Sequence, residues 1–140
     1  MTLAGNYGVI SADQSDFAYD GDAKCTVKRF DEIYSAAATH DIATPDAAKK
    51  VRLRSLDVRP LSATSVGVYF KTEDGTATLL GTNASNPQTL DMDGVDGPQG
   101  FIKQHNPDGW AETETAGKAF QIVLDAAVPV AVNGTYIEVD

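Results

Sequence analysis

Apolar and polar residues alternate along several short segments of this chain, with the period of a β-strand. Two segments show this most plainly, because their apolar side chains recur at every second position (Val66, Val68 and Phe70 in residues 65–72; Phe120, Ile122 and Leu124 in residues 118–124). A period of two places such side chains on one face of a strand, where they can pack against a core. These segments therefore predict strands with one buried face.

Further strands are predicted from the same alternation and from turn residues between the segments, at 24–30, 49–59, 77–82, 88–92 and 128–139, with another starting at 101. The Asp74-Gly75 turn predicts a hairpin in which 65–72 pairs with 77–82. Residues 31–38 are compatible with one or two helical turns, but the pattern favours strand or irregular structure. About eight short strands at regular spacing predict an all-β fold, an antiparallel β-sandwich or a jelly roll.

The chain has the length of one domain, 140 residues. We expect a single β-sandwich domain over residues 24–140, preceded by an extended N-terminal arm over residues 1–23. The arm is polar and acidic but contains the aromatic residues Tyr7, Phe17 and Tyr19. It is either mobile or ordered against a neighbouring subunit, and in the second case these aromatic side chains would be its anchors.

The net charge of −9 argues against nucleic acid or an anionic membrane surface as the partner. The first residues contain no signal-like apolar run, and no stretch approaches the length of a transmembrane helix. We therefore expect a protein made in the cytoplasm that binds neither a membrane nor nucleic acid.

Basic residues concentrate in one predicted strand, where Lys50, Arg52 and Arg54 would share a face opposite Val51 and Leu53. This stripe, with nearby Arg59, pairs either with acidic residues of the chain itself or with an acidic partner surface. Its three strand residues are therefore candidate partner-binding residues. Trp110 is another candidate, because it follows a tight turn and is either a core plug or an exposed anchor.

Catalytic and metal-binding patterns are missing from the sequence. His40 and His105 have no nucleophile at a known motif spacing, and the single cysteine, Cys25, excludes an internal disulfide. The acidic loop at residues 91–97 lacks the spacing of a calcium loop and reads as a solvated loop. We expect no enzymatic activity, no cofactor and no metal.

The order of motifs in the last third resembles that of small structural proteins of tailed bacteriophages. It runs from Gly109-Trp110 through an acidic, threonine-rich segment at 112–115 and Ala116-Gly117 into the two final strands, and ends with Tyr136-Ile137-Glu138-Val139. Upstream segments at 47–56, 65–71 and 78–81 follow the same order, so the resemblance covers residues 39–139.

Within that group, capsid decoration (cement) proteins have about this size and a jelly-roll-like fold. The resemblance implies a non-enzymatic protein that binds the major capsid protein on the outside of a virion, as a homotrimer, and stabilises the shell. The alternatives are a receptor- or carbohydrate-binding module of a tail or head fibre, with Trp110 or Tyr69 exposed, and a head–tail connector component.

Overall fold

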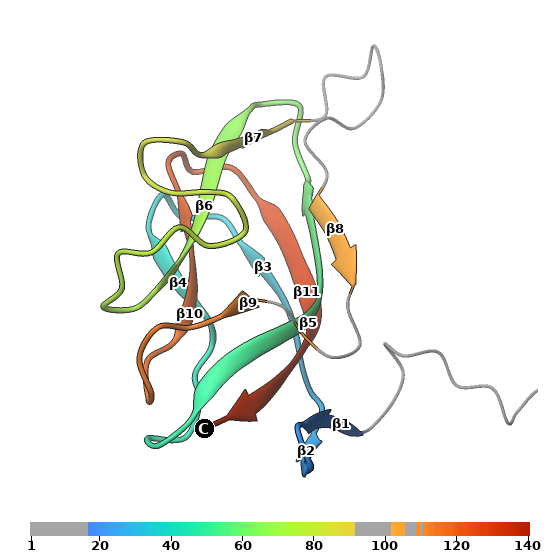
Figure 1. Ribbon diagram of the computed structural model, residues 1–140. Helices are drawn as coiled ribbons and strands as arrows, with labels where there is room; N and C mark the ends of the chain where they lie inside the picture. Colours follow the sequence, from blue (N-terminus) through green and yellow to red (C-terminus); the bar gives the residue numbers. More distant parts are fainter. Residues whose placement is uncertain (1–16, 92–101, 106–108, 110) are drawn as a thin grey trace, which may run out of the picture.

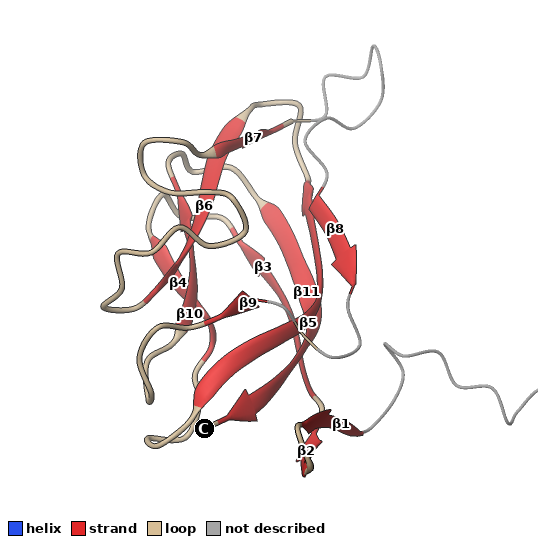
Figure 2. Cartoon of the chain, in the orientation of Figure 1, coloured by secondary structure: helices blue, strands red, loops and turns tan. Residues whose placement is uncertain are grey.

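The computed structural model describes residues 17–91, 102–105, 109 and 111–140. Within these ranges the chain consists of strands and loops, as Figure 2 shows. The strands in chain order are β1 (Phe17–Asp20), β2 (Ala23–Thr26), β3 (Lys28–Tyr34), β4 (Thr39–Ala43), β5 (Lys50–Pro60), β6 (Val66–Thr72), β7 (Gln88–Leu90), β8 (Ile102–His105), β9 (Ala111–Glu112), β10 (Phe120–Leu124) and β11 (Val130–Val139).

The strands form two facing sheets and one small hairpin (Figure 1). One sheet has the order β3-β11-β5-β8, with β9 also paired to β5, and the other has the order β4-β10-β6-β7. The hairpin consists of β1 and β2, and the strand pairs are antiparallel throughout. The predicted all-β antiparallel sandwich is therefore confirmed.

The pairing also defines the path of the chain. Strands β3, β4, β5 and β6 pair in turn with β11, β10, β8 and β7, so the outgoing half of the chain is matched by the returning half in reverse order. A double-sheet antiparallel ribbon wrapped in this way is a jelly roll. The two termini of the ribbon, β3 and β11, lie side by side in one sheet.

The main core fills the space between the sheets, and the alternating segments supply much of it. The six apolar side chains that alternation assigned to one face in β6 and β10 are at most 2% exposed. Phe70 and Phe120 stack there, with ring centroids 5.6 Å apart, and Val58 and Val132 of the opposite sheet belong to the same buried cluster. Burial of apolar surface on both inner faces is the main stabilising contribution to such a sandwich.

Strand β5 contains a β-bulge that changes which face its residues occupy. Ser55 pairs with Thr135, but the next pair along is Leu53 with Tyr136, so Arg54 is an extra residue on β5. Before the bulge the odd-numbered apolar residues are buried, and after it the even-numbered Leu56 and Val58 are buried. The prediction of an uninterrupted basic face is therefore wrong, because the extra residue breaks the alternation at Arg54.

The predicted first strand, residues 24–30, is split between β2 and β3 in the structure. Val27, between these strands, is buried in the second cluster beneath the hairpin, whereas Phe30 enters the main core. Strand β3 then continues to Tyr34, which agrees with one of the two alternatives for this segment. The sequence does not predict β4, whose apolar residues Ile42 and Ala43 are adjacent and do not alternate.

The predicted hairpin after β6 is wrong in its return strand. Residues 77–82 pair with β6 at a single isolated bridge, Leu79 with Phe70, and the ladder partner of β6 is β7. Leu80 and Gly81 both have positive φ (55° and 72°), which turns the chain out of the sheet. The hydroxyl group of Thr82 then accepts a hydrogen bond from the Phe70 amide at 2.9 Å.

Candidate partner-binding surface

The β1–β2 hairpin lies against the outer face of β11, near the point where that strand ends (Figure 1). Its turn is Gly21-Asp22, and Gly21 has a φ of 59°, which glycine adopts without strain. Residues 17–23 of the predicted arm therefore form part of this hairpin and its turn, and Tyr7 lies outside the described residues.

A second hydrophobic cluster anchors the hairpin to the sheet. Ala18 and Val27 are each 5% exposed and pack against Ile137 and Val139, with the half-buried Cys25 beside them. These β11 side chains point away from the main core, so they would face solvent without the hairpin. The sequence indicates this additional burial at the end of β11. Tyr136 faces the main core while Ile137 and Val139 face outward, so both faces of the strand are apolar there and both need to be buried.

The outer side of the hairpin exposes two aromatic residues. Phe17 is 45% exposed and Tyr19 is 56% exposed, whereas Ala18 between them is buried. The Lys24 ammonium group lies 3.9 Å from the centre of the Phe17 ring, a cation–π contact. Two aromatic rings and a cation on a short anchored hairpin form a compact contact surface, as an interface hot spot requires.

Arg52 ties the hairpin to the sheet. Its Nη1 lies 3.0 Å from Asp20 Oδ1 at the end of β1, and its Nε donates to Glu112 Oε2 at 2.8 Å. Burial acts to lower the pKa of Arg52, but the hydrogen bonds to Glu112 and Asp20 outweigh it and raise that pKa. Both carboxylates belong to this chain. At Arg52 the structure therefore shows the first of the two alternatives for the basic stripe, which is pairing with acidic residues of the chain itself.

The other stripe residues divide between core and surface. Arg54 is 1% exposed, so it cannot offer its side chain to an approaching partner, and the prediction of a contact there is corrected by its burial at the bulge. Arg59 pairs with Asp57 two residues away, at 3.1 Å. Lys50 is half-buried and has no ion-pair partner within the described ranges. It therefore stays a candidate contact residue.

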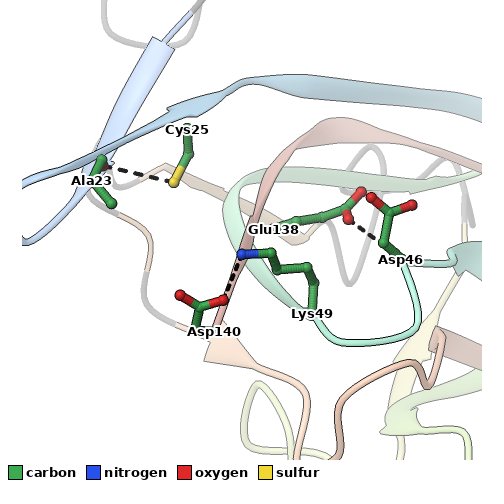
Figure 3. A network of polar contacts seen from close by, with 6 residues as sticks. All are labelled: Ala23, Cys25, Asp46, Lys49, Glu138 and Asp140. Carbon is green, nitrogen blue, oxygen red and sulfur yellow. Dashed lines mark hydrogen bonds and ion pairs between the residues drawn. The ribbon is translucent and has the colours of Figure 1, made fainter.

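A polar network lies beneath β2, where the β4–β5 loop meets the last residues of the chain (Figure 3). Glu138 accepts a hydrogen bond from the Asp46 amide at 2.9 Å and pairs with Lys28. Lys49 pairs with Asp140, and the Cys25 thiol points to the carbonyl oxygen of Ala23 at 3.8 Å. These contacts join the β4–β5 loop and the start of β3 to the end of the chain, and the Cys25 contact lies within β2.

Electrostatics at Glu138 favours its ionised form. Partial burial acts to raise its pKa, but the hydrogen bonds from Lys28 and from the Asp46 amide outweigh that effect and lower the pKa. In turn, the hydrogen bond to Glu138 raises the pKa of Lys28 more than burial lowers it. The network therefore consists of matched charges that tie the start of β3 and the β4–β5 loop to β11.

The candidate catalytic residues do not assemble into a site in the described part of the chain. His40 stacks on Tyr34 with centroids 4.7 Å apart, and its Nε2 is 2.9 Å from the carbonyl oxygen of Ala36. Cys25 lies in the hairpin network, among lysine and acidic residues. No group of three His, Cys, Asp or Glu residues is placed to hold a metal ion in the ranges that the structure covers.

Trp110 and the acidic loop from residue 92 onward lie outside the described residues, so their predictions stay predictions. None of the described segments forms a helix long and apolar enough to cross a membrane. No family model, curated protein or solved structure matches the chain.

Proposed function

We propose that this protein is a non-enzymatic structural protein that binds the outer surface of a phage capsid and stabilises the shell, with the β1–β2 hairpin as its main contact. The exposed aromatic pair Phe17 and Tyr19 carries the proposal. Four large hydrophobic side chains are exposed in the described residues. Phe17 and Tyr19 lie two positions apart on one anchored strand, whereas Ile33 and Leu61 lie elsewhere in the fold.

The fold and the charge agree with this role. Double-sheet jelly rolls are common in viral capsid proteins and lectins, although a fold alone does not define a function. An acidic protein with a net charge of −9 suits the outside of a particle better than the surface that faces packaged DNA. A protein that binds the assembled shell, and not its free subunits, stabilises the shell by mass action.

The predicted partner is the major capsid protein, and the predicted assembly is a homotrimer at the joints between capsid subunits. The hairpin suits such a joint because its backbone and its buried side are already ordered by β11. Binding therefore needs little further loss of conformational entropy, which favours affinity per unit of contact area.

Co-sedimentation with capsids that lack this protein tests the proposal. We expect the double variant Phe17→Ala/Tyr19→Ala to lose capsid affinity by about tenfold or more, as for aromatic hot-spot residues. The matched control is Ile33→Ala/Leu61→Ala, which also removes two exposed apolar side chains and should bind as the wild type does. Equal binding by the hairpin variant and the wild type would remove the hairpin from the interface.

Immunogold labelling of virions from the source lysate tests the location. Label over the whole head would support a decoration protein. Label confined to the neck or tail would instead favour the connector or the receptor-binding alternative, and the absence of label from intact particles would argue against a place on the virion surface.

A further inference from the structure

A hollow on the opposite sheet has the features of a ligand site, and it lies on β6 and the connection that follows β6. In β6, Val66, Val68 and Phe70 point into the core, so the alternate residues Tyr69 and Lys71 lie on the outer face. The long β6–β7 connection folds back beside this strand (Figure 1). Between them is a hollow of about 400 Å³, lined by Tyr69, Lys71, Gly75, Thr76, Ala77, Asn83, Ala84 and Ser85.

The wall formed by the connection is held in place by side-chain hydrogen bonds. Thr82 accepts from the Phe70 amide and donates to the carbonyl oxygen of Leu79, both at 2.9 Å. Asn83 accepts from the Ser85 amide at 2.9 Å and donates to the Thr78 hydroxyl at 3.0 Å. A wall fixed in this way is preorganised, so a ligand does not have to order it on binding.

The far end of the same wall is also tied down. Glu114 lies outside the lining and accepts a hydrogen bond from the Ala77 amide at 2.9 Å. Asn83 and Asn86 exchange backbone hydrogen bonds at 3.0 and 3.3 Å, which close the turn that carries Ala84 and Ser85. Both rims of the hollow are therefore defined by contacts within the chain.

The charge in this hollow is unbalanced. Its lining contains one cation, Lys71, and no carboxylate, on a chain whose net charge is −9. Lys28, Lys49 and Lys118 each pair with a carboxylate, but Lys71 has no such partner among the residues that the structure describes. Across the strand pair from Lys71 lies Gln121, whose amide group already donates to Asp41 at 2.7 Å.

Other hollows on the described surface differ in this respect. The one at Arg29 also contains Asp31, and the one beneath β2 contains Asp46 and Glu138 with its lysines. Their cations have carboxylates beside them, so an incoming anion would meet repulsion as well as attraction. The lining of the hollow at Lys71 offers an incoming carboxylate a cation and a set of neutral hydrogen-bonding groups, and the Glu114 carboxylate behind its wall is already engaged by the Ala77 amide.

We propose that this hollow binds an acidic saccharide. The Tyr69 ring provides an apolar face for a sugar ring, as aromatic side chains with a polar handle do at wet binding sites. Lys71 pairs with the sugar carboxylate, and the hydroxyl groups of Thr76 and Ser85 take hydrogen bonds from the sugar hydroxyls. The proposal is independent of the hairpin, because it uses the other sheet.

Chemical-shift titration of the folded chain tests this site with three probes: an oligogalacturonate, a neutral galacto-oligosaccharide of equal length, and acetate. We expect the oligogalacturonate to shift amides of Tyr69, Lys71 and residues 75–85, and to bind about tenfold more tightly than the neutral sugar, since hydrogen bonds to a charged group are the stronger ones. Acetate should bind far more weakly than either sugar.

Variants separate the two parts of the site. Lys71→Gln should remove the preference for the acidic sugar but leave the neutral sugar unchanged, whereas Tyr69→Ala should weaken both. Arg29→Gln is the matched control, because it removes a cation from the opposite sheet. Shifts outside the hollow, equal shifts with acetate, or equal weakening by Arg29→Gln would each overturn the proposal.

Discussion

The two outer faces of the sandwich differ in how they are covered. On the β3-β11-β5-β8 sheet, the hairpin buries Ile137 and Val139 in a second hydrophobic cluster, and the Arg52–Asp20 ion pair joins the hairpin to β5. On the β4-β10-β6-β7 sheet, the β6–β7 connection lies beside β6 and is held by polar side chains, and it leaves a hollow at Tyr69 and Lys71.

This difference shows two ways to cover a sheet. An apolar patch on an outer face must be buried, so it draws an additional element onto itself. A polar outer face needs no cover, so a loop beside it can leave space for a ligand. We therefore expect the hairpin face to contribute stability and a contact surface, and the β6 face to contribute recognition.

The largest expected effect comes from the cluster beneath the hairpin. Ile137→Ala should lower the free energy of unfolding by about 3 kcal/mol, because it leaves a cavity at a fully buried site. Urea denaturation measures this, and amide exchange in β1 and β2 should rise with it. Ile33→Ala, at a side chain 62% exposed on the same sheet, should change the stability by less than about 0.5 kcal/mol. Similar losses from both variants would mean that the hairpin does not bury Ile137.

A smaller effect is expected on the β6 face. Thr82→Val keeps the shape of the side chain but leaves the buried Phe70 amide without its acceptor, so the free energy of unfolding should fall by about 2 kcal/mol. Thr89→Val, at an exposed position of β7, is the control and should be close to neutral. Thermal unfolding of both variants would show whether the connection depends on this hydroxyl group; equal melting temperatures would contradict that dependence.

The link between the hairpin and β5 should matter less. Arg52→Gln removes the ion pairs with Asp20 and Glu112, and we expect a loss of about 1 kcal/mol, since Arg52 is partly exposed and its pairs are screened. Amide exchange should accelerate in the hairpin before it does in β6. The control Arg59→Gln breaks a surface pair within one strand and should leave hairpin exchange unchanged. Uniform acceleration in both sheets would argue against a local tether.

The smallest effect is a pH dependence at the base of the hairpin. The pKa of Glu138 is lowered from its ordinary value of 4.5, so its stabilising contribution is complete above that pH and is lost as the pH falls through the lowered pKa. We expect Glu138→Gln to reduce stability at pH 7 by about 0.5 kcal/mol, because Lys28 is exposed and screened.

The same variant should also lose less stability than the wild type when the pH falls below about 4.5, because it has no carboxylate to protonate. Urea denaturation at a series of pH values gives both slopes. Glu32→Gln, which removes a carboxylate from an exposed position on β3, is the control variant. An unchanged acid slope in Glu138→Gln would show that this ion pair does not contribute to acid sensitivity.

Local patterns predicted much of the fold. Alternation located β5, β6, β10 and β11, because each of these strands has one face in the main core. The phase of that alternation also changes within β5, from Val51 and Leu53 to Leu56 and Val58, which marks the bulge at Arg54. The expected basic face neglected this change, and the Asp74-Gly75 turn predicted a strand where Leu80 and Gly81 leave the sheet.

The candidate surfaces were less predictable. Phe17 and Tyr19 were identified from composition alone, as aromatic residues in a polar segment, but their shared exposed face depends on the pairing of β1 with β2. The partners of Arg52 lie 32 and 60 positions away along the chain, on strands that pairing brings together. No local pattern identifies such partners, because each is defined by register between strands.

By itself, the sequence determined the period-two segments, the turns between them and the acidic surface, because these follow from local conformational preference and from composition. Only the tertiary structure decided the jelly-roll pairing, the burial of Arg54, the hairpin cover over Ile137 and the hollow at Lys71. The first three arise where residues distant in the chain share one small volume, and the hollow arises where the β6–β7 connection folds back beside β6; in each case packing decides which side chains are buried, paired or exposed.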